Sequence, residues 1–323
     1  MTLVLAGDIG GTNARLALAE VNAKTRIVAE HGGMSQSIPD FGEFVADFLA
    51  TNGARPDRAC LAIAGPVLGN AVSGTNLPWT VEANALGKRI GISRVRLIND
   101  FAAIGFGIRV LTESDLLTLQ TGRADPSGLI GIIGAGTGLG EGLVVRTGGQ
   151  WTVLPSEGGH ATYAPVTAQE RDLHAFMSSR YGGHVSVERV VSGPGIVDIF
   201  DFLTASRGVS ETIRDEMSRE DPAAVITRHA LANTDAAAVE ALDLFITAYG
   251  SQAGNLALTV LASGGIYVAG GIAAKIAPKL GEGRFLEAFR SKGRMRKLLE
   301  QFPVHVIRNP DVGLLGAASA AGH

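Results

Sequence analysis

The chain has very little cysteine: Cys60 is the only one among its 323 residues. A single thiol cannot form an internal disulfide, which is typical of a protein from a reducing compartment. Cys60 stands in the apolar run 59–64, so we expect a buried core thiol rather than a nucleophile. No basic region followed by a long apolar run opens the chain, so no signal peptide is indicated. We therefore predict a cytoplasmic protein.

Charge is also scarce, since only 18% of the residues are charged and the net charge is −3. Nucleic-acid binding usually requires a basic surface, so no nucleic-acid partner is expected. The long apolar stretch 242–269 is interrupted by Asp243, Gln252 and Asn255, which favours a buried helix and strand over a membrane span. At 323 residues the chain is long enough for two domains. Its 46% of hydrophobic residues is enough to give each a sizeable core.

Two common phosphate-binding motifs are missing. The sequence has no G-x-x-x-x-G-K-S/T, which excludes a standard P-loop. Its two glycine-rich loops precede strands rather than helices, which excludes the dinucleotide fingerprint of Rossmann dehydrogenases. There is also no His or Cys cluster at zinc spacing.

What the chain does have is the stretch G-D-I-G-G-T-N at 7–13, between the apolar runs 3–6 and 15–21. Strand, glycine turn and strand predict a β-hairpin. Glycines allow a tight turn whose N–H groups form a concave site for anions. Asp8 would repel a bare phosphate, so a cation such as Mg²⁺ is expected between them. A plain glycine-rich turn is the alternative interpretation.

The same order recurs later in the chain. The apolar run 129–133 leads into the glycine-rich loop 134–140, and a second run of strand formers follows from Glu141. The repetition suggests two related halves, each contributing one loop to a phosphate-containing ligand.

Two further groups of polar residues follow predicted strands. Asn99 and Asp100 end the buried strand 95–98, where Asp100 is either a helix N-cap or a functional carboxylate. Ligands in open α/β sheets bind beyond the carboxyl ends of strands, which favours function. Glu157 and His160 flank two glycines and offer an acceptor and a donor suited to vicinal hydroxyls. The mixture of strands and helices predicts an α/β fold, with a loop-like stretch and a domain boundary within 110–128.

Five motifs, at 8–13, 97–101, 134–140, 157–160 and 309–316, together resemble the bacterial glucokinase family of the actin-like ATPase and sugar kinase superfamily. They keep their order along nearly the whole chain, and the Cys-rich zinc motif of many relatives is lacking. The resemblance implies an α/β, two-domain actin-like ATPase (ribonuclease H-like) fold with an active-site cleft between a small and a large domain. The small domain would comprise 1–110 plus about 298–323, and the large one 111–297.

The resemblance further implies ATP-dependent phosphorylation of glucose to glucose 6-phosphate, with Asp100 as general base, ATP and Mg²⁺ as cofactors, and a homodimer. Asp8 would hold Mg²⁺, directly or through water. The implied sugar contacts are Asn76, Asn99, Asp100, Gly138, Glu157, His160 and Glu188. The implied ATP contacts are Gly7, Asp8, Ile9, Gly10, Gly11, Thr12, Asn13, Gly136, Thr137, Gly270 and Gly271.

Two alternatives stay open at this point. One is a kinase of another hexose, such as fructose, mannose or N-acetylglucosamine. The other is an actin-like ATPase that does not act on sugars. A sugar-sensing repressor is disfavoured, because the first predicted strand begins at Leu3 and leaves no room for an upstream DNA-binding domain.

Overall fold

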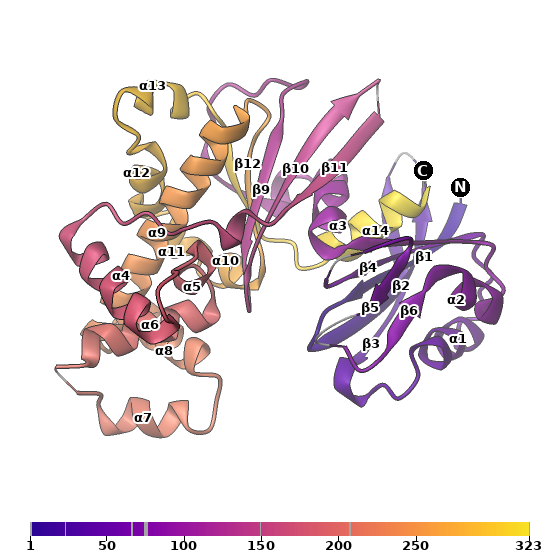
Figure 1. The fold of residues 1–323 in the computed structure, drawn as a ribbon. Coiled ribbons are helices and arrows are strands. Elements are labelled where there is room, and N and C mark those ends of the chain that lie inside the picture. The colour runs from indigo at the N-terminus through magenta and orange to yellow at the C-terminus, as the bar shows by residue number, and fades with distance from the viewer. Residues whose placement is uncertain are drawn as a thin grey trace. The chain divides into compact units, whose positions relative to one another are not determined.

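A computed structural model describes residues 2–22, 24–65, 67–73, 77–148, 150–206 and 208–322. The chain divides into two units, shown in Figure 1. Unit 1 comprises the chain up to Asp115, the short segment Val153–Pro155 and the C-terminal segment from Asn309. Unit 2 comprises Leu116–Thr152 and Ser156–Arg308. The ends of the chain therefore belong to the same unit.

Unit 1 is built on a five-stranded sheet in the order β3-β2-β1-β4-β7. The hairpin β1–β2 and strand β3 are antiparallel, and β4 and β7 run parallel to β1. A small β5–β6 hairpin stands apart from this sheet. The strands are β1 (Thr2–Ile9), β2 (Asn13–Val21), β3 (Thr25–Met34), β4 (Arg58–Ile63), β5 (Ala71–Ser73), β6 (Thr80–Glu82) and β7 (Arg94–Asn99). The helices are α1 (Phe41–Thr51), α2 (Ala83–Ile90), α3 (Asp100–Gly107) and α14 (Val312–Gly322).

Alternation along the central strands places hydrophobic side chains on both faces of this sheet. In β1, Leu5 and Ile9 belong to one buried cluster, which also contains residues of α1 and α2. Val4 and Ala6 belong to a second cluster, which contains residues of α3 and α14. The sheet is therefore covered on both faces. Cys60 of β4 lies in the second cluster and is fully buried, which confirms the expected core thiol.

The C-terminal helix α14 packs closely against α3, as Figure 1 shows. The close approach depends on glycine. A Cβ atom at Gly316 would overlap the carbonyl oxygen of Ala103, and one at Gly107 would overlap that of Val312. Because α3 begins at Asp100, this contact also fixes the helix that carries the predicted base.

We expect Gly316→Ala to destabilise the protein. The gain in helix propensity is about 0.5–1 kcal/mol, whereas overpacking typically costs about 1–3 kcal/mol. A net loss of about 1–2 kcal/mol should appear as a lower urea midpoint. Gly33→Ala is the matched control, because its Cβ would meet only a side-chain atom of Phe44, at 3.9 Å. Equal midpoints for the two variants would contradict the packing argument.

Unit 2 contains a six-stranded sheet in the order β11-β10-β9-β12-β13-β8, apart from Val153–Pro155 of β11, which belong to unit 1. The strands are β8 (Leu116–Gln120), β9 (Ile130–Ala135), β10 (Leu139–Thr147), β11 (Gln150–Ser156), β12 (Gly265–Ala269) and β13 (Val304–Ile307). The helices are α4 (Ala168–Tyr181), α5 (Val187–Val190), α6 (Gly193–Thr204), α7 (Glu211–Met217), α8 (Pro222–Leu231), α9 (Ala236–Val260), α10 (Gly271–Lys275), α11 (Ala277–Leu280), α12 (Arg284–Arg290) and α13 (Arg296–Leu299).

The two sheets share one plan, which agrees with the two related halves suggested by the sequence. In each, a first strand pairs with an antiparallel second strand, and two later strands extend the sheet in parallel beyond the first. Unit 2 adds β8 at the edge beside β13. The two glycine-rich loops therefore occupy equivalent positions, each in the turn between the first and second strands of its own sheet.

One expectation about secondary structure was wrong. The stretch 110–128 was expected to be loop-like, but Leu116–Gln120 forms strand β8, antiparallel to β13. Its leucines are half-buried, so the polar neighbours in the sequence hid an edge strand. The units change after Asp115, Thr152, Pro155 and Arg308. The domain boundaries at 110 and about 298 stay predictions from the sequence. Strand β13 belongs to the sheet of unit 2.

Candidate active site

The first glycine-rich loop connects β1 to β2, so the predicted hairpin is confirmed. Its turn is closed by a hydrogen bond from the Gly10 N–H to the Asn13 carbonyl, at 2.8 Å. Ser35 holds it from the side, since its hydroxyl donates to the Gly10 carbonyl at 2.6 Å and its N–H to that of Thr12 at 2.9 Å. Thr12 and Asn13 are exposed. The turn is thus a braced loop with an open surface.

Asp8 precedes this turn and has two other carboxylates, those of Asp100 and Asp311, in its surroundings. Burial and the nearby Asp100 carboxylate, with a smaller contribution from Asp311, raise its pKa from 3.8 to about 6. Arg15 opposes this effect. However, Arg15 is already paired with Asp311 at 2.5 Å and Glu30 at 2.7 Å, so it compensates Asp8 only in part.

Helix α14 begins directly against Asp8. A Cβ atom at Gly313 would lie 2.7 Å from Asp8 Oδ2, so a larger residue would displace the carboxylate or the helix. The C-terminal motif 309–316 therefore serves the first glycine-rich loop, although the two are some 300 positions apart in the sequence. The same motif supplies Asp311, the partner of Arg15.

Asn99 and Asp100 lie where β7 ends and α3 begins, and both are half-buried. Asn99 is the N-cap: its Oδ1 accepts from the Phe101 N–H at 2.9 Å, and its Nδ2 donates to the Gly65 carbonyl at 3.2 Å. Asp100 is the first helical residue, and its Oδ1 accepts from the same N–H at 2.9 Å. The capping role that the sequence left open for Asp100 thus falls to Asn99.

The second glycine-rich loop connects β9 to β10. The Gly136 N–H donates to the Gly138 carbonyl at 2.8 Å, and the Gly136 carbonyl accepts from the Gly193 N–H at 2.8 Å. Glu188, from the short helix α5, reaches the loop and accepts from the Leu139 N–H at 2.8 Å. A Cβ atom at Gly138 would overlap this carboxylate. Thr137 is exposed at the tip of the loop.

Three of the predicted sugar contacts converge beside this loop. His160 lies with Nδ1 3.5 Å from Glu157 Oε2 and with Nε2 3.7 Å from Glu188 Oε1. Glu157 and His160 are exposed, and about 29% of the Glu188 side chain is accessible. Two carboxylates and an imidazole on one surface provide several acceptors and a donor for neighbouring hydroxyl groups.

Sequence reasoning missed the residue beneath this cluster. Glu141 of β10 is buried, and its Oε1 accepts from Gln252 Nε2 of α9 at 2.8 Å. Burial raises its pKa. A Cβ atom at Gly158 would overlap Glu141 Oε2, so the carboxylate packs directly under the turn that carries Glu157 and His160. In the sequence Glu141 is one polar residue of a strand that also contains Arg146, and no local pattern sets it apart.

The glycine pair after β12 lies beside the second loop. Gly270 has φ +91°, and a Cβ atom there would be 2.5 Å from the Ala135 carbonyl oxygen, so only glycine fits. Gly271 opens α10 and has no such neighbour within 4 Å. Asn76, the remaining predicted sugar contact, lies outside the described residues.

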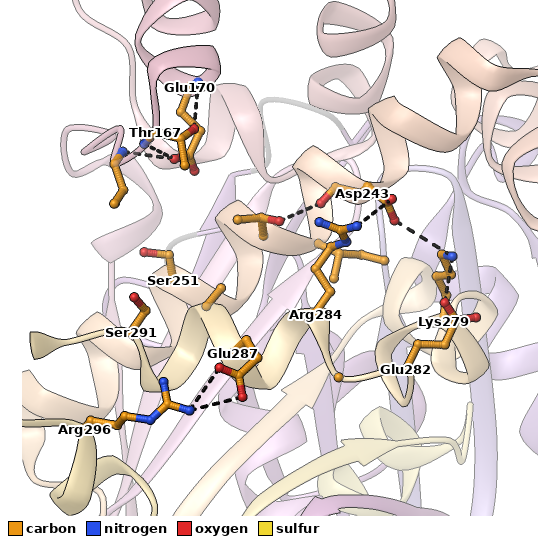
Figure 2. A pocket seen from close by; sticks show the side chains of 15 residues that line it. Thr167, Glu170, Asp243, Ser251, Lys279, Glu282, Arg284, Glu287, Ser291 and Arg296 are labelled. Atoms are coloured by element: carbon orange, nitrogen blue, oxygen red, sulfur yellow. Dashed lines mark hydrogen bonds and ion pairs between the residues drawn. The ribbon is translucent and has the colours of Figure 1, made fainter.

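Unit 2 also contains a cavity of about 620 Å³ bordered by α4, α9 and α12 (Figure 2). Ion pairs within its lining include Arg284 with Asp243 at 3.0 Å and Arg296 with Glu287 at 3.0 Å. None of the predicted site residues that the structure describes lines this cavity. The glycine-rich loops and the His160 cluster are therefore separate from it.

The described residues contain no group of three or more His, Cys, Asp or Glu side chains that could hold a metal ion. Nor do they include a helix both long and apolar enough to span a membrane.

Comparison with known proteins identifies the family of the chain. The Glucokinase family model matches residues 5–323. A glucokinase of Nostoc sp. is 45% identical over an alignment of 339 positions, gaps included, which covers 99% of each chain. The crystal structure of a glucokinase from an Antarctic psychrotroph is 33% identical, with a TM-score of 0.87, and covers 100% of this chain and 99% of its own.

A second solved structure has a similar fold. It is a ROK family glucokinase from Streptomyces griseus in complex with glucose and AMPPNP, 19% identical, with a TM-score of 0.67 and 99% of each chain covered. The two-domain actin-like ATPase fold implied by the sequence is thereby confirmed. With its full length matched by the family model and by a relative of 45% identity, the chain belongs to the glucokinase family.

Proposed function

We propose that this protein transfers the γ-phosphoryl group of ATP to the primary hydroxyl of glucose, with Asp100 as general base. The observation that carries the proposal is the convergence of Glu157, His160 and Glu188, from two separate stretches of unit 2, beside the second glycine-rich loop. Relatives named glucokinase support glucose as the acceptor.

In this proposal Asp100 accepts the proton of the hydroxyl that attacks the γ-phosphorus in line. Its position after the parallel strand β7 suits this role, since ligands of α/β sheets bind beyond the carboxyl ends of strands. Asn99 is assigned to an adjacent sugar hydroxyl. With its side-chain oxygen capping α3, its backbone position is well defined.

Glu157, His160, Glu188, Gly138 and Asn76 are assigned to the remaining sugar contacts. A site that hydrogen-bonds a hydroxyl can reject an analogue that lacks it by about 10⁴-fold, because its own polar groups are then left unpaired. The Leu139 N–H holds Glu188 in place, which supports a fixed rather than a mobile acceptor.

The phosphates of ATP are assigned to the first loop (Gly7, Asp8, Ile9, Gly10, Gly11, Thr12 and Asn13) and to Gly136 and Thr137. Gly270 and Gly271 are assigned to the adenosine. The exposed, glycine-rich turns allow the close backbone approach that phosphate binding needs.

Asp8 fits a site for Mg²⁺, directly or through water. Mg²⁺ prefers oxygen ligands and retains several waters. Burial and then the carboxylates of Asp100 and Asp311 raise the pKa of Asp8, and a cation would relieve the repulsion between these carboxylates. The bound ion would offset negative charge on the phosphates. A homodimer and a cytoplasmic location stay predictions from the sequence.

The test is ADP release from Mg²⁺-ATP with glucose, mannose, fructose, galactose and N-acetylglucosamine in turn. The proposal predicts turnover mainly with glucose. Turnover mainly with another hexose would overturn the assigned specificity, and ATP turnover that no sugar stimulates would favour an actin-like ATPase with a different acceptor.

A further inference from the structure

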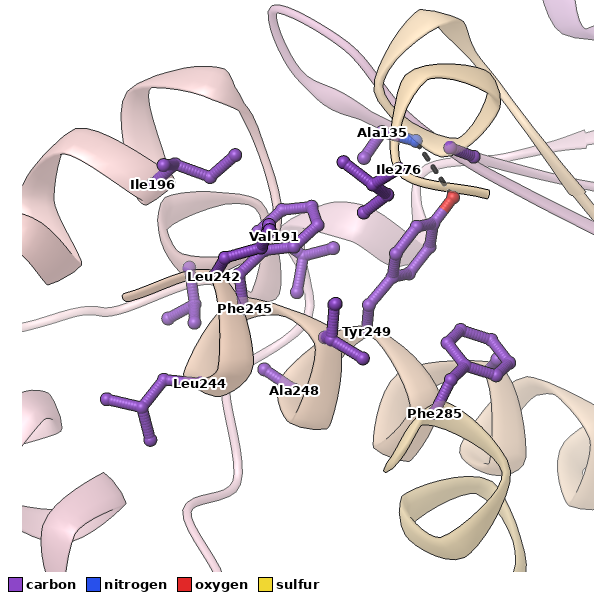
Figure 3. Packing of buried hydrophobic residues seen from close by; sticks show 14 of the residues in the cluster. Ala135, Val191, Ile196, Leu242, Leu244, Phe245, Ala248, Tyr249, Ile276 and Phe285 are labelled. Atoms are coloured by element: carbon purple, nitrogen blue, oxygen red, sulfur yellow. Dashed lines mark hydrogen bonds between the residues drawn. The ribbon is translucent and has the colours of Figure 1, made fainter. Parts of the chain in front are cut away.

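Tyr249 occupies the centre of the long helix α9 and is fully buried. Its ring meets those of Phe245 and Phe285 nearly edge-on, each at a centroid distance of 5.6 Å. Figure 3 shows the phenol reaching out of this apolar cluster towards Ala135. A buried hydroxyl needs polar partners, and those of Tyr249 lie at the ends of two strands.

The hydroxyl of Tyr249 connects β9 with β12. It accepts from the Ala135 N–H at 3.1 Å and lies 3.3 Å from the carbonyl oxygens of both Ile133 and Ala269. Ala135 immediately precedes Gly136, and Ala269 immediately precedes Gly270. Burial raises the pKa of Tyr249, so the phenol keeps its proton and can donate it to either carbonyl.

The strand pairing explains why a side chain is needed at this point. Strands β9 and β12 pair in parallel as far as Gly134 and Ala269. At Gly270 the chain turns away with φ +91°. The Ala135 N–H thus comes just beyond the last pair of the ladder, and the phenol takes the place of the next strand residue.

We propose that Tyr249 is a positioning residue for the nucleotide, setting the spacing between the loop at Gly136 and Thr137 and the pair Gly270 and Gly271. This inference rests on the proposed function, which assigns the first group to phosphates and the second to adenosine. A nucleoside polyphosphate touches both groups at once, so it depends on their spacing. A ligand that touches one group alone does not.

The test is Tyr249→Phe, which keeps the packed ring and removes the hydroxyl. The Ala135 N–H then loses its partner. We expect the KM for ATP and the Kd for ADP to rise about tenfold, with less than about a threefold change in the KM for glucose. The Kd values for adenosine alone and for pyrophosphate alone, measured by calorimetry or competition, should change by less than about threefold.

Tyr163→Phe is the matched control. Tyr163 is another buried tyrosine of unit 2, and its hydroxyl donates to Glu170 Oε1 at 3.2 Å. Its loss should lower thermal stability without raising the KM for ATP. The inference is overturned if Tyr249→Phe leaves the Kd for ADP within twofold of the parent value. It is also overturned if the Kd values for adenosine and pyrophosphate rise as much as the Kd for ADP.

Failure of the proposed function would look different. In that case the unaltered protein itself would show no glucose-dependent ADP release. The binding comparison between ADP, adenosine and pyrophosphate would still decide whether Tyr249 sets the spacing of the two glycine groups.

Discussion

Asp100→Asn is expected to lower kcat by about 10²–10⁴-fold, the usual contribution of a general base. Asparagine keeps the shape of the side chain and its bond to the Phe101 N–H, but it cannot accept the proton of the attacking hydroxyl. Because Asn99 caps α3, the helix should survive the change. The Kd for glucose, measured by equilibrium binding, should change little.

Asp47→Asn provides the charge-matched control, since Asp47 is exposed on α1 of the same unit. Its kcat should equal that of the parent. If Asp100→Asn retained near-normal kcat, or lost activity only because glucose no longer bound, Asp100 would not be the base.

Asp8→Asn is expected to stabilise the folded protein and to lower its catalytic activity. A carboxyl pKa raised from 3.8 to about 6 means that ionisation costs about 3 kcal/mol more in the folded chain than in the unfolded one. The folded state holds the proton more tightly, so this contribution to stability is present below pH 3.8 and is lost as the pH rises through about 6. Asparagine carries no such cost.

The difference in unfolding free energy between Asp8→Asn and the parent should therefore grow from pH 4 to pH 7. We expect it to reach about 1–3 kcal/mol, measured by urea titration at each pH. Subtracting the parent removes the contributions of other groups. A difference that is constant with pH, or that favours the parent at pH 7, would contradict the assigned environment of Asp8.

The same variant should lose about 10²-fold in kcat/KM, since a bound cation contributes several kcal/mol to phosphoryl transfer. Raising the Mg²⁺ concentration should recover part of this loss if Asp8 holds the ion. A full loss that does not respond to Mg²⁺ would assign Asp8 to another role.

The sequence predicted the local elements well where turn chemistry was strong. The glycine-rich stretch 7–13 predicted the hairpin β1–β2, and the second glycine-rich loop predicted β9 and β10. It failed at β8, because an edge strand needs only half-buried side chains and its alternation was weak. Asp100 stayed ambiguous in the sequence because a cap and a base favour the same position.

The roles of residues that act through tertiary contacts could not be predicted from the sequence. Tyr249 stands in an alanine-rich helix and reads as an ordinary core aromatic, since its link to Ala135 spans 114 positions. Glu141 reads as part of a strand, and only the packing of Gly158 shows what it supports. In both cases the informative contact joins segments that no local pattern relates.

Identification of the reaction product is the direct test of phosphoryl transfer from ATP to the primary hydroxyl of glucose. Purified protein with Mg²⁺-ATP and glucose would be followed by ³¹P NMR, with assignment of the phosphorylated carbon. We expect glucose 6-phosphate and ADP in equal amounts. Inorganic phosphate with unchanged glucose, or a phosphate on another hydroxyl, would contradict it.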